Sequence, residues 1–442
     1  MENNLKREIL LKQDTPMWHF QSYQSGCCLR ATEVKPKLDK FLAKLKDFED
    51  SYYQDKSNDD KSKNNALDYK LWFEPIGCPK EIPIEKPSTD KFGNPKLNKK
   101  GEQMYDNLYP LFFANMGATD RDKKHLVYYP EGVTMHLFSF NTKLLNFVEE
   151  NLRAFFASHS FGTRQDKGFG FFSLKDKPLD LSGAKYVFEL PNTIGENDFE
   201  SLFQYINYFH KMIRSGINEN GVYYKSFMYF YAKEKCNTTW DKPVIRYKFE
   251  YFHPKYIKNE NLKEEISKFI RDAEDYQKGN KENKIKLYTK SRSLFRDALG
   301  LASRQLWKGY SKDIITIQSN NKDVVRFKSP ITYRPIYDNG WSVYIYLNQR
   351  DLEEFKQYQF TIKNRNNSNE YVDYMGETKV LKNMRIYKEF SLEEYFDFII
   401  QIGLDRHTDD SKEHGEKTND YVEHIFTNNN FKKINQNANT TK

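Results

Sequence analysis

Apolar residues recur at intervals of three and four positions in two stretches of the N-terminal half, and this spacing predicts two amphipathic helices. The first covers about residues 32–48, with Thr32 as its cap, and the second about residues 142–157, with Asn141 as its cap. Shorter apolar or alternating runs predict strands before, between and after these helices. The strand candidates are residues 7–12, 69–73, 126–140 (bent at 130–132) and 171–174.

The predicted order of strand, helix, two strands, helix and strand is that of a ferredoxin-like (RRM-like) unit, in which two helices cover one face of an antiparallel sheet. Further elements, starting near residue 185, predict a second unit of the same mixed α/β (α+β) type. They are strands at 186–190, 222–231, 244–252, 324–327 and 342–347, and helices at 199–214, 261–277 and 292–307. We therefore expect tandem ferredoxin-like domains over residues 1–182 and 183–404.

Three polar stretches lack apolar periodicity. Residues 51–65 and 86–103 are rich in Asn, Asp, Lys and Pro, and we expect them to be insertions in the first domain. Residues 405–442 offer few apolar side chains to a core, so we expect them to form a disordered polar tail.

Composition narrows the class of protein. The 442 residues are 38% hydrophobic and 16% aromatic, and they carry a net charge of +8, which permits a nucleic-acid partner without requiring one. The four cysteines form no CxxC pair, which favours free thiols in a reducing cytoplasm over a zinc site. No apolar run approaches the ~20 residues of a membrane helix. We expect a cytoplasmic protein without membrane contact, metal or cofactor.

The most informative segment is residues 161–170, which reads Phe-Gly-Thr-Arg-Gln-Asp-Lys-Gly-Phe-Gly between the second helix and the last strand of the first domain. Glycines adopt positive φ and allow a phosphate or a ribose to approach the main chain closely, while Arg164 and Lys167 supply positive charge. Such a loop can hold a nucleic-acid backbone. The residues alone leave open an ordinary helix-to-strand turn with two solvated cations.

In this position the segment resembles the glycine-rich loop of the RAMP superfamily of CRISPR-associated proteins, with Gly162, Arg164, Lys167, Gly168, Phe169 and Gly170 in matching places. Residues 15–17 and 29–38 are similar to elements of the two-domain Cmr subunit of type III-B effector complexes. Leu29, Arg30, Lys35 and Leu38 coincide with the family there, whereas Glu33, Pro36 and Asp39 depart from it. Weaker similarities lie at 130–135, 297–301 and 326–330.

The resemblance implies RNA-binding residues on the first helix and in the glycine loop. They are Arg30, Lys35, Lys37, Lys40, Gly162, Arg164, Lys167, Gly168, Phe169 and Gly170. Without the family, the three lysines are simply a solvated helix face.

The resemblance further implies an RNA-binding structural subunit of a Cmr complex in antiviral defence, in contact with guide (CRISPR) RNA, target RNA and other Cmr or RAMP subunits. The chain has no HExxH, GxSxG or Walker motif, so we predict no catalytic residue. Two alternatives stay open. One is a RAMP-family endoribonuclease that processes CRISPR precursor RNA, with His19 as a possible general base. The other is a protein-binding scaffold without a direct role in RNA binding.

Overall fold

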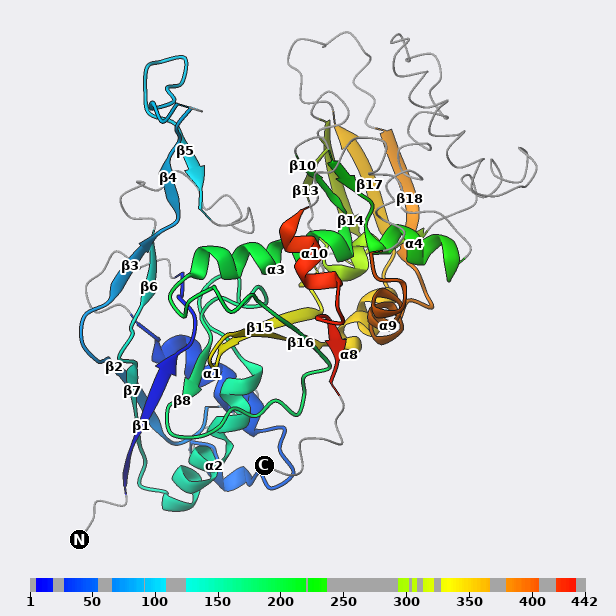
Figure 1. Ribbon diagram of the computed structural model, residues 1–442. Helices are drawn as coiled ribbons and strands as arrows, with labels where there is room; N and C mark the ends of the chain where they lie inside the picture. The colour runs from blue at the N-terminus through cyan, green and yellow to red at the C-terminus, as the bar shows by residue number, and fades with distance from the viewer. Residues whose placement is uncertain are drawn as a thin grey trace, which may run out of the picture. The chain divides into compact units, whose positions relative to one another are not determined.

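The structure is a computed structural model, shown in Figure 1. It describes residues 5–18, 28–54, 66–90, 92–108, 125–219, 222–236, 293–301, 304–307, 313–321, 327–365, 379–404 and 419–434. The chain divides into two compact units. The first comprises residues 1–207, 332–346 and 430–442, and the second comprises residues 208–331 and 347–429.

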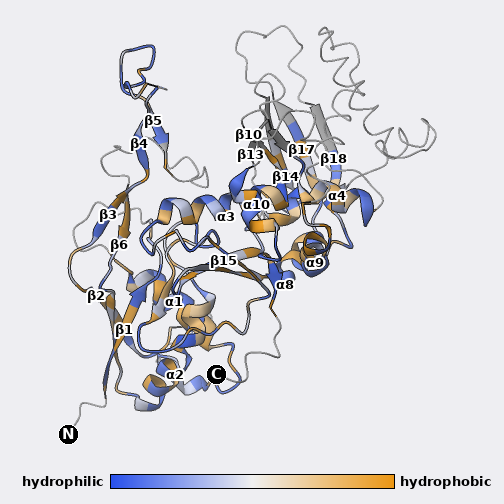
Figure 2. Cartoon of the chain, viewed as in Figure 1, coloured by the Kyte–Doolittle hydropathy of each residue, from blue (hydrophilic) through white to orange (hydrophobic). Residues whose placement is uncertain are grey.

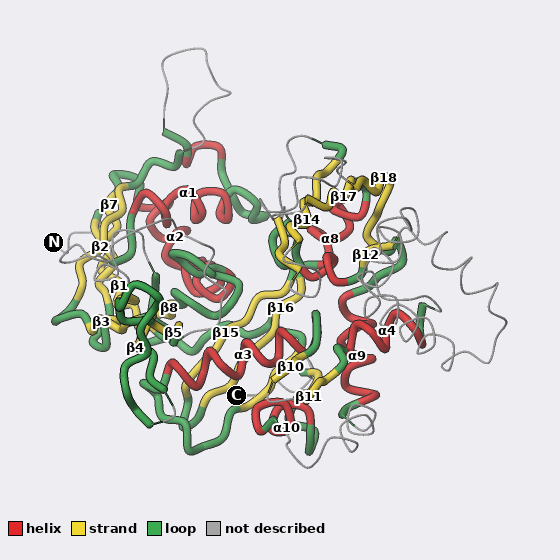
Figure 3. The backbone as a smooth tube through the Cα atoms, turned by 90° about the horizontal axis from the view of Figure 1, so that it is seen from above, coloured by secondary structure: helices red, strands yellow, loops and turns green. Residues whose placement is uncertain are grey.

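The first unit opens with a four-stranded antiparallel sheet in the order β2-β7-β1-β8. Its strands are β1 (Lys6–Gln13), β2 (Lys70–Pro75), β7 (Val133–Phe138) and β8 (Phe172–Leu174). Helices α1 (Ala31–Leu42) and α2 (Thr142–Ser158) lie together on one side of this sheet in Figure 3. The chain order β1-α1-β2-β7-α2-β8 confirms the predicted ferredoxin-like arrangement.

The apolar stripes of both helices form the core with one face of the sheet. Val34 and Leu38 of α1, Leu145 and Leu152 of α2 and Met135 of β7 are all fully buried. The Asn141 side chain caps α2 by accepting from the main-chain N–H of Leu144 at 3.1 Å, as predicted. The predicted cap Thr32 is wrong, because α1 already begins at Ala31 and no side chain caps it.

Paired strands flank the predicted insertion at 86–103. Strand β3 (Lys80–Pro83) pairs with β6 (His125–Tyr128), and β4 (Glu85–Pro87) pairs with β5 (Tyr105–Asn107). These two ribbons form an arm that continues beyond β2 in Figure 1. In the other predicted insertion, η1 (Asp50–Tyr52) is a single 3-10 turn, and residues 55–65 lie outside the described residues.

A second four-stranded sheet has the order β15-β16-β9-β19. Its strands are β9 (Tyr186–Glu189), β15 (Ile331–Tyr337), β16 (Trp341–Leu347) and β19 (Lys432–Lys433). With helices α3 (Phe199–Arg214) and α10 (Asp420–Phe426), the chain order is β9-α3-β15-β16-α10-β19, which repeats the pattern of the first sheet. Figure 2 shows hydrophobic and hydrophilic residues interleaved along α3, as the amphipathic pattern requires.

The prediction of a disordered tail over 405–442 is therefore wrong for residues 419–434. Val422, Ile425 and Phe426 of α10 are buried, and the Phe426 ring lies 5.4 Å from that of Phe209 in α3. Lys432 pairs with Val187 in β9. The apolar residues of this segment are few but fall at helical spacing, so the segment contributes a final helix and strand. The predicted domain division at 182/183 stays a prediction.

The second unit contains a five-stranded sheet in the order β12-β18-β17-β14-β13. Its strands are β12 (Ser293–Leu294), β13 (Arg304–Trp307), β14 (Asp313–Ser319), β17 (Phe360–Arg365) and β18 (Lys379–Ile386). This unit also includes α10 and the end of α3. Its other described elements are β10 (Ile217–Glu219), β11 (Val222–Tyr224), α4 (Phe227–Glu234), η4 (Arg296–Leu299), α8 (Gln349–Lys356) and α9 (Leu392–Ile402).

Two predictions fail in the second unit. The strand predicted over 222–231 ends at Tyr224, because the Ser226 side chain caps helix α4 by accepting from the Tyr229 N–H at 3.2 Å. The helix predicted over 292–307 is instead β12, η4 and β13. The strand and helix predicted at 244–252 and 261–277, and most of the strand at 324–327, lie outside the described residues.

None of the helices in the described ranges combines the length and the apolar character needed to cross a membrane.

Candidate functional site

The glycine loop, residues 161–170, folds onto the segment that follows β1. The N–H of Phe161 donates to the Gly170 carbonyl at 2.9 Å and closes the loop on itself. The N–H of Gly170 donates to the carbonyl of Pro16 at 3.0 Å, and the N–H of Thr163 donates to that of Trp18 at 2.9 Å. Two segments singled out from the sequence, residues 15–17 and 161–170, are therefore in direct contact.

A third such segment, the start of α1, holds the first half of the loop through Glu33. One carboxylate oxygen of Glu33 accepts from the Gly162 N–H at 3.0 Å and from the Gln165 side-chain amide at 3.2 Å. The Lys37 ammonium donates to the same oxygen at 3.0 Å and to the Ser160 carbonyl at 3.2 Å. Glu33, which departs from the family pattern, is thus an anchor of the loop.

The second half of the loop is held by Tyr333 of the second sheet and by Phe203 of α3, two residues of the first unit. The N–H of Tyr333 in β15 donates to the Asp166 carbonyl at 3.1 Å, and the Lys167 ammonium lies 5.4 Å from the centre of the Tyr333 ring. The Phe169 ring stacks on Phe203 with 3.6 Å between centroids and 4° between planes. Phe169 is fully buried, so its ring packs inside the protein, and its place among the RNA-binding residues stays a prediction.

Two of the loop glycines, Gly162 and Gly170, fit tightly against the protein's own main chain. Gly162, Gly168 and Gly170 all have positive φ, between +64° and +88°. A Cβ added to Gly170 would lie 1.9 Å from the Phe161 carbonyl oxygen, and one added to Gly162 would lie 2.6 Å from that of Trp18. The predicted positive φ is confirmed. The atoms that lie close to Gly162 and Gly170 are main-chain atoms of this protein, and they occupy the space expected for a phosphate or a ribose.

The loop keeps two half-buried cations, Arg164 and Lys167. Arg164 has φ +59°, in the left-handed region that residues with a Cβ rarely adopt, and its carbonyl accepts from the Lys167 N–H at 2.8 Å. This hydrogen bond closes a turn that sets both side chains on one short stretch of the loop. They are the loop residues whose chemistry suits a phosphate.

The lysines predicted on α1 do not form one solvated face. The Lys35 ammonium donates to Asp39 at 2.8 Å and to the Leu67 carbonyl at 2.9 Å, and it lies 4.1 Å from the centre of the Tyr69 ring. It therefore compensates a buried carboxylate. Lys37 donates to Glu33, which binds the loop, and Lys40 is the one exposed lysine of the three. Arg30, the half-buried residue just before α1, makes no side-chain cap.

A buried carboxylate lies beside the anchor of the loop. The N–H of Asp14 donates to the Phe171 carbonyl at 3.0 Å, and the Lys12 ammonium is 3.8 Å from its side chain. Burial raises the pKa of Asp14 to about 7, against the opposing effects of a hydrogen bond from Ser173 and the charge of Lys12. Its Oδ2 has no hydrogen-bond partner among the described residues.

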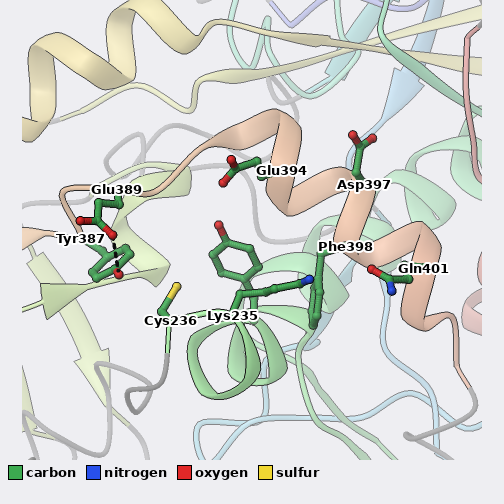
Figure 4. A pocket seen from close by; sticks show the side chains of 9 residues that line it. Lys235, Cys236, Tyr387, Glu389, Glu394, Asp397, Phe398 and Gln401 are labelled. Atoms are coloured by element: carbon green, nitrogen blue, oxygen red, sulfur yellow. Dashed lines mark hydrogen bonds between the residues drawn. The ribbon is translucent and has the colours of Figure 1, made fainter.

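The second unit has a pocket of about 470 Å³, shown in Figure 4. The carboxylates of Glu389, Glu394 and Asp397 line it with a single lysine, so its charge disfavours phosphate. The Tyr387 hydroxyl donates to Glu389 at 3.2 Å. Burial raises the pKa of the Cys236 thiol to about 11, which keeps it protonated and unreactive near neutral pH.

Metal and general-base chemistry gain no support from the ranges that the structure describes. They contain no group of three His, Cys, Asp or Glu residues placed to hold a metal ion. His19, the possible general base, lies outside them. A ring nitrogen of His159 is 3.0 Å from the Phe155 carbonyl, and its ring stacks on that of Phe155, so this histidine packs against α2.

The sequence predicted the position of the loop but not the residues that hold it in place. Neither Glu33 nor Tyr333 was predicted to be part of the site. The one available signal was the spacing of four residues between Glu33 and Lys37, which favours an ion pair on a helix.

Comparison with protein families gives two matches that together span nearly the whole chain. The Cmr1 N-terminal domain matches residues 4–217, and the Cmr1 C-terminal domain matches residues 223–433. The second match ends with the last residue of β19, so it includes the helix and strand of the predicted tail. Among curated proteins no relative matches the chain.

Proposed function

Because the chain belongs to the Cmr1 family and is a subunit of a type III-B CRISPR (Cmr) effector complex, we propose that its glycine loop contacts the RNA of that complex. Guide RNA and target RNA are the nucleic acids involved, and other Cmr subunits are its protein partners. The proposed contact is to phosphates and sugars, which leaves sequence reading to the pairing of guide with target.

One observation carries this proposal: three separate chain segments converge on the loop and hold it in a fixed conformation. The segment that follows β1 hydrogen-bonds to it, Glu33 of α1 binds its first turn, and β15 pairs with its second half. A loop held in this way presents Arg164 and Lys167 without a large ordering cost on binding, which is the benefit of preorganisation. The pocket of the second unit is lined by more carboxylates than cations, so it is negative where the loop is positive and fits RNA poorly.

We propose that the chain acts in the complex without catalysing a reaction. Membership of the Cmr1 family supports this proposal.

The test is the affinity of the purified full chain for single-stranded RNA over a range of salt concentrations. Replacing Arg164 and Lys167 together with alanine should weaken binding to RNA of any sequence. The slope of log K against log salt should fall by ~0.7 for each phosphate that the variant no longer neutralises. The matched control is Lys44→Ala with Lys46→Ala, which removes the same charge from exposed positions.

Equal decreases in affinity for the two double variants would assign the effect to overall charge and overturn the role of the loop. The same RNA samples, resolved on a denaturing gel without metal, test the endoribonuclease alternative. Specific fragments from the wild-type chain would contradict a non-catalytic role.

A further inference from the structure

The arm carries an unusual concentration of exposed apolar side chains at its end, residues 88–105, which we name the arm tip. Phe92 is 76% exposed, Leu97 56%, Met104 45% and Tyr105 41%. These are four of the six large hydrophobic side chains that are exposed among the described residues. Exposed apolar side chains scattered singly are ordinary, but a cluster on one projecting element marks an interaction surface.

The arm tip is built from two turns of the same design. The Asp90 carboxylate accepts from the N–H groups of Phe92 at 2.8 Å and Asn94 at 2.9 Å. The Asn98 side-chain oxygen accepts from the N–H groups of Lys100 at 2.8 Å and Glu102 at 3.1 Å. Each side chain satisfies two main-chain donors of its own turn, which fixes the turn locally.

The two turns are also tied to each other and to the ribbon. The N–H of Ser88 donates to the Met104 carbonyl at 2.8 Å, and the N–H of Lys96 donates to the Ser88 carbonyl at 2.9 Å. The Gln103 side-chain amide donates to the Ser88 carbonyl as well, at 2.9 Å. The apolar side chains therefore stand on an ordered scaffold, so little conformational entropy is lost when they are buried in an interface.

The charge of the arm argues against RNA as its partner. Residues 85–107 contain five lysines and four acidic residues, so the segment is nearly neutral. One of these lysines, Lys86, lies 3.5 Å from Glu200 of α3 and is partly compensated within the chain. A phosphate backbone selects clustered positive charge, whereas protein interfaces are rich in aromatic and Met side chains and poor in charge at their centre.

We propose that the arm tip docks this chain onto a neighbouring protein subunit of the Cmr complex by inserting Phe92 and Leu97 into an apolar groove of that subunit. The inference rests on membership of the complex and is independent of RNA binding by the glycine loop. The arm tip is an anchor for protein assembly, and the loop is the contact for nucleic acid.

The experiment measures how tightly the full chain joins a complex assembled from the other Cmr subunits and a guide RNA. Phe92→Ser combined with Leu97→Ser should weaken joining by at least about tenfold, because a few central apolar side chains dominate such interfaces. The control is Phe140→Ser, which removes a ring that is 79% exposed outside the arm. It should join as tightly as wild type.

Binding of RNA by the isolated chain separates this proposal from the preceding one. The arm-tip variant should bind RNA with wild-type affinity, whereas the Arg164, Lys167 double variant should not. If the arm-tip variant joins the complex normally but binds RNA weakly, the occupant is nucleic acid and the proposal is overturned. A wild-type homodimer that the same variant disrupts would overturn it in favour of a second copy of this chain.

A second pair of variants tests the scaffold rather than the apolar side chains. Asp90→Ala removes the acceptor for two main-chain donors and should weaken joining, while both apolar side chains remain. Asp90→Asn keeps an acceptor oxygen at the same place, as Asn98 does in the other turn, and should restore joining. Equal affinity of all three chains would show that turn order contributes nothing and would contradict a preorganised tip.

Discussion

The glycine loop and the arm tip are both turns with glycines at positive φ, yet the two sets of glycines serve different ends. At Gly162 and Gly170 an added Cβ would collide with main-chain oxygens of the protein itself. At Gly93 and Gly101 of the arm tip, an added Cβ would meet nothing within 4 Å. Glycine in the arm tip is needed for its φ alone, and glycine in the loop is needed for φ and for close packing.

The same contrast separates their side chains. The two rings of the loop, Phe161 and Phe169, are fully buried, whereas the rings of the arm tip, Phe92 and Tyr105, are 76% and 41% exposed. A glycine-rich segment with cations and aromatic rings can thus either pack inside the protein or expose its side chains at the surface. The glycine loop and the arm tip have similar compositions, and the segments that pack around each one determine whether its rings are buried or exposed.

The largest effect is expected when a loop glycine is replaced, because its Cβ would collide with main-chain atoms, whereas that of an arm-tip glycine would not. Gly170→Ala should lower the free energy of unfolding by about 3 kcal/mol or more, because it adds a main-chain collision to the strain of positive φ. Gly101→Ala, at φ +80°, should cost only about 1 kcal/mol for the strain. Urea unfolding of the two full-length variants measures both values. Similar decreases would mean that the loop relaxes and that its close packing is unimportant.

A smaller effect is expected from the carboxylate beside the loop anchor. The pKa of Asp14 is raised to about 7, mainly by burial, so between about pH 4 and pH 7 the folded chain holds a proton that the unfolded chain releases. Stability should therefore fall as the pH rises through this window. Lys12 and Ser173 oppose the raised pKa, and the charge of Glu196 adds to it.

Asp14→Asn has no proton to lose, so its stability should fall less than that of wild type from pH 4 to 7 and should exceed it above pH 7. Urea midpoints at pH 5 and pH 8 for both chains give the comparison, since all other titrating groups are shared. Parallel pH dependences would exclude Asp14 as a group that is neutral when folded.

The smallest effect is expected from the helix that supports the loop. Lys37→Ala removes the donor to Glu33 and to the Ser160 carbonyl and should cost about 1 kcal/mol, since the lysine is partly exposed. Lys40→Ala, on the same helix but exposed, should change stability by less than about 0.5 kcal/mol. Thermal unfolding of the two variants compares them. A larger decrease in stability for Lys40→Ala would reverse the assignment of structural and solvated lysines on α1.

The local patterns predicted much of the first unit because its elements are set by periodicity and caps. The stripe of α2 and its cap Asn141 appear where expected, and the strand order follows from the alternation of elements. The failures occur where the local signal is weak. Residues 419–434 have few apolar side chains, but Val422, Ile425, Phe426 and Phe431 are buried, and the low average hydrophobicity of the segment concealed this. Over 222–231, the cap Ser226 overrides a strand-like aromatic run.

The sequence by itself determined the family, the first βαββαβ unit and the position of the glycine loop, because these depend on local order and spacing along the chain. The last helix and strand of the second βαββαβ pattern lie in the segment that was predicted to be disordered. Only the tertiary structure decided what the loop residues touch. Glu33, Trp18 and Tyr333 are distant from the loop in sequence and hydrogen-bond to it. The buried ring of Phe169 stacks on Phe203, whereas Arg164 and Lys167 stay half-buried. The exposure of Phe92 on the arm tip was likewise decided by pairing between strands, because burial depends on which distant segments meet and no local pattern encodes that.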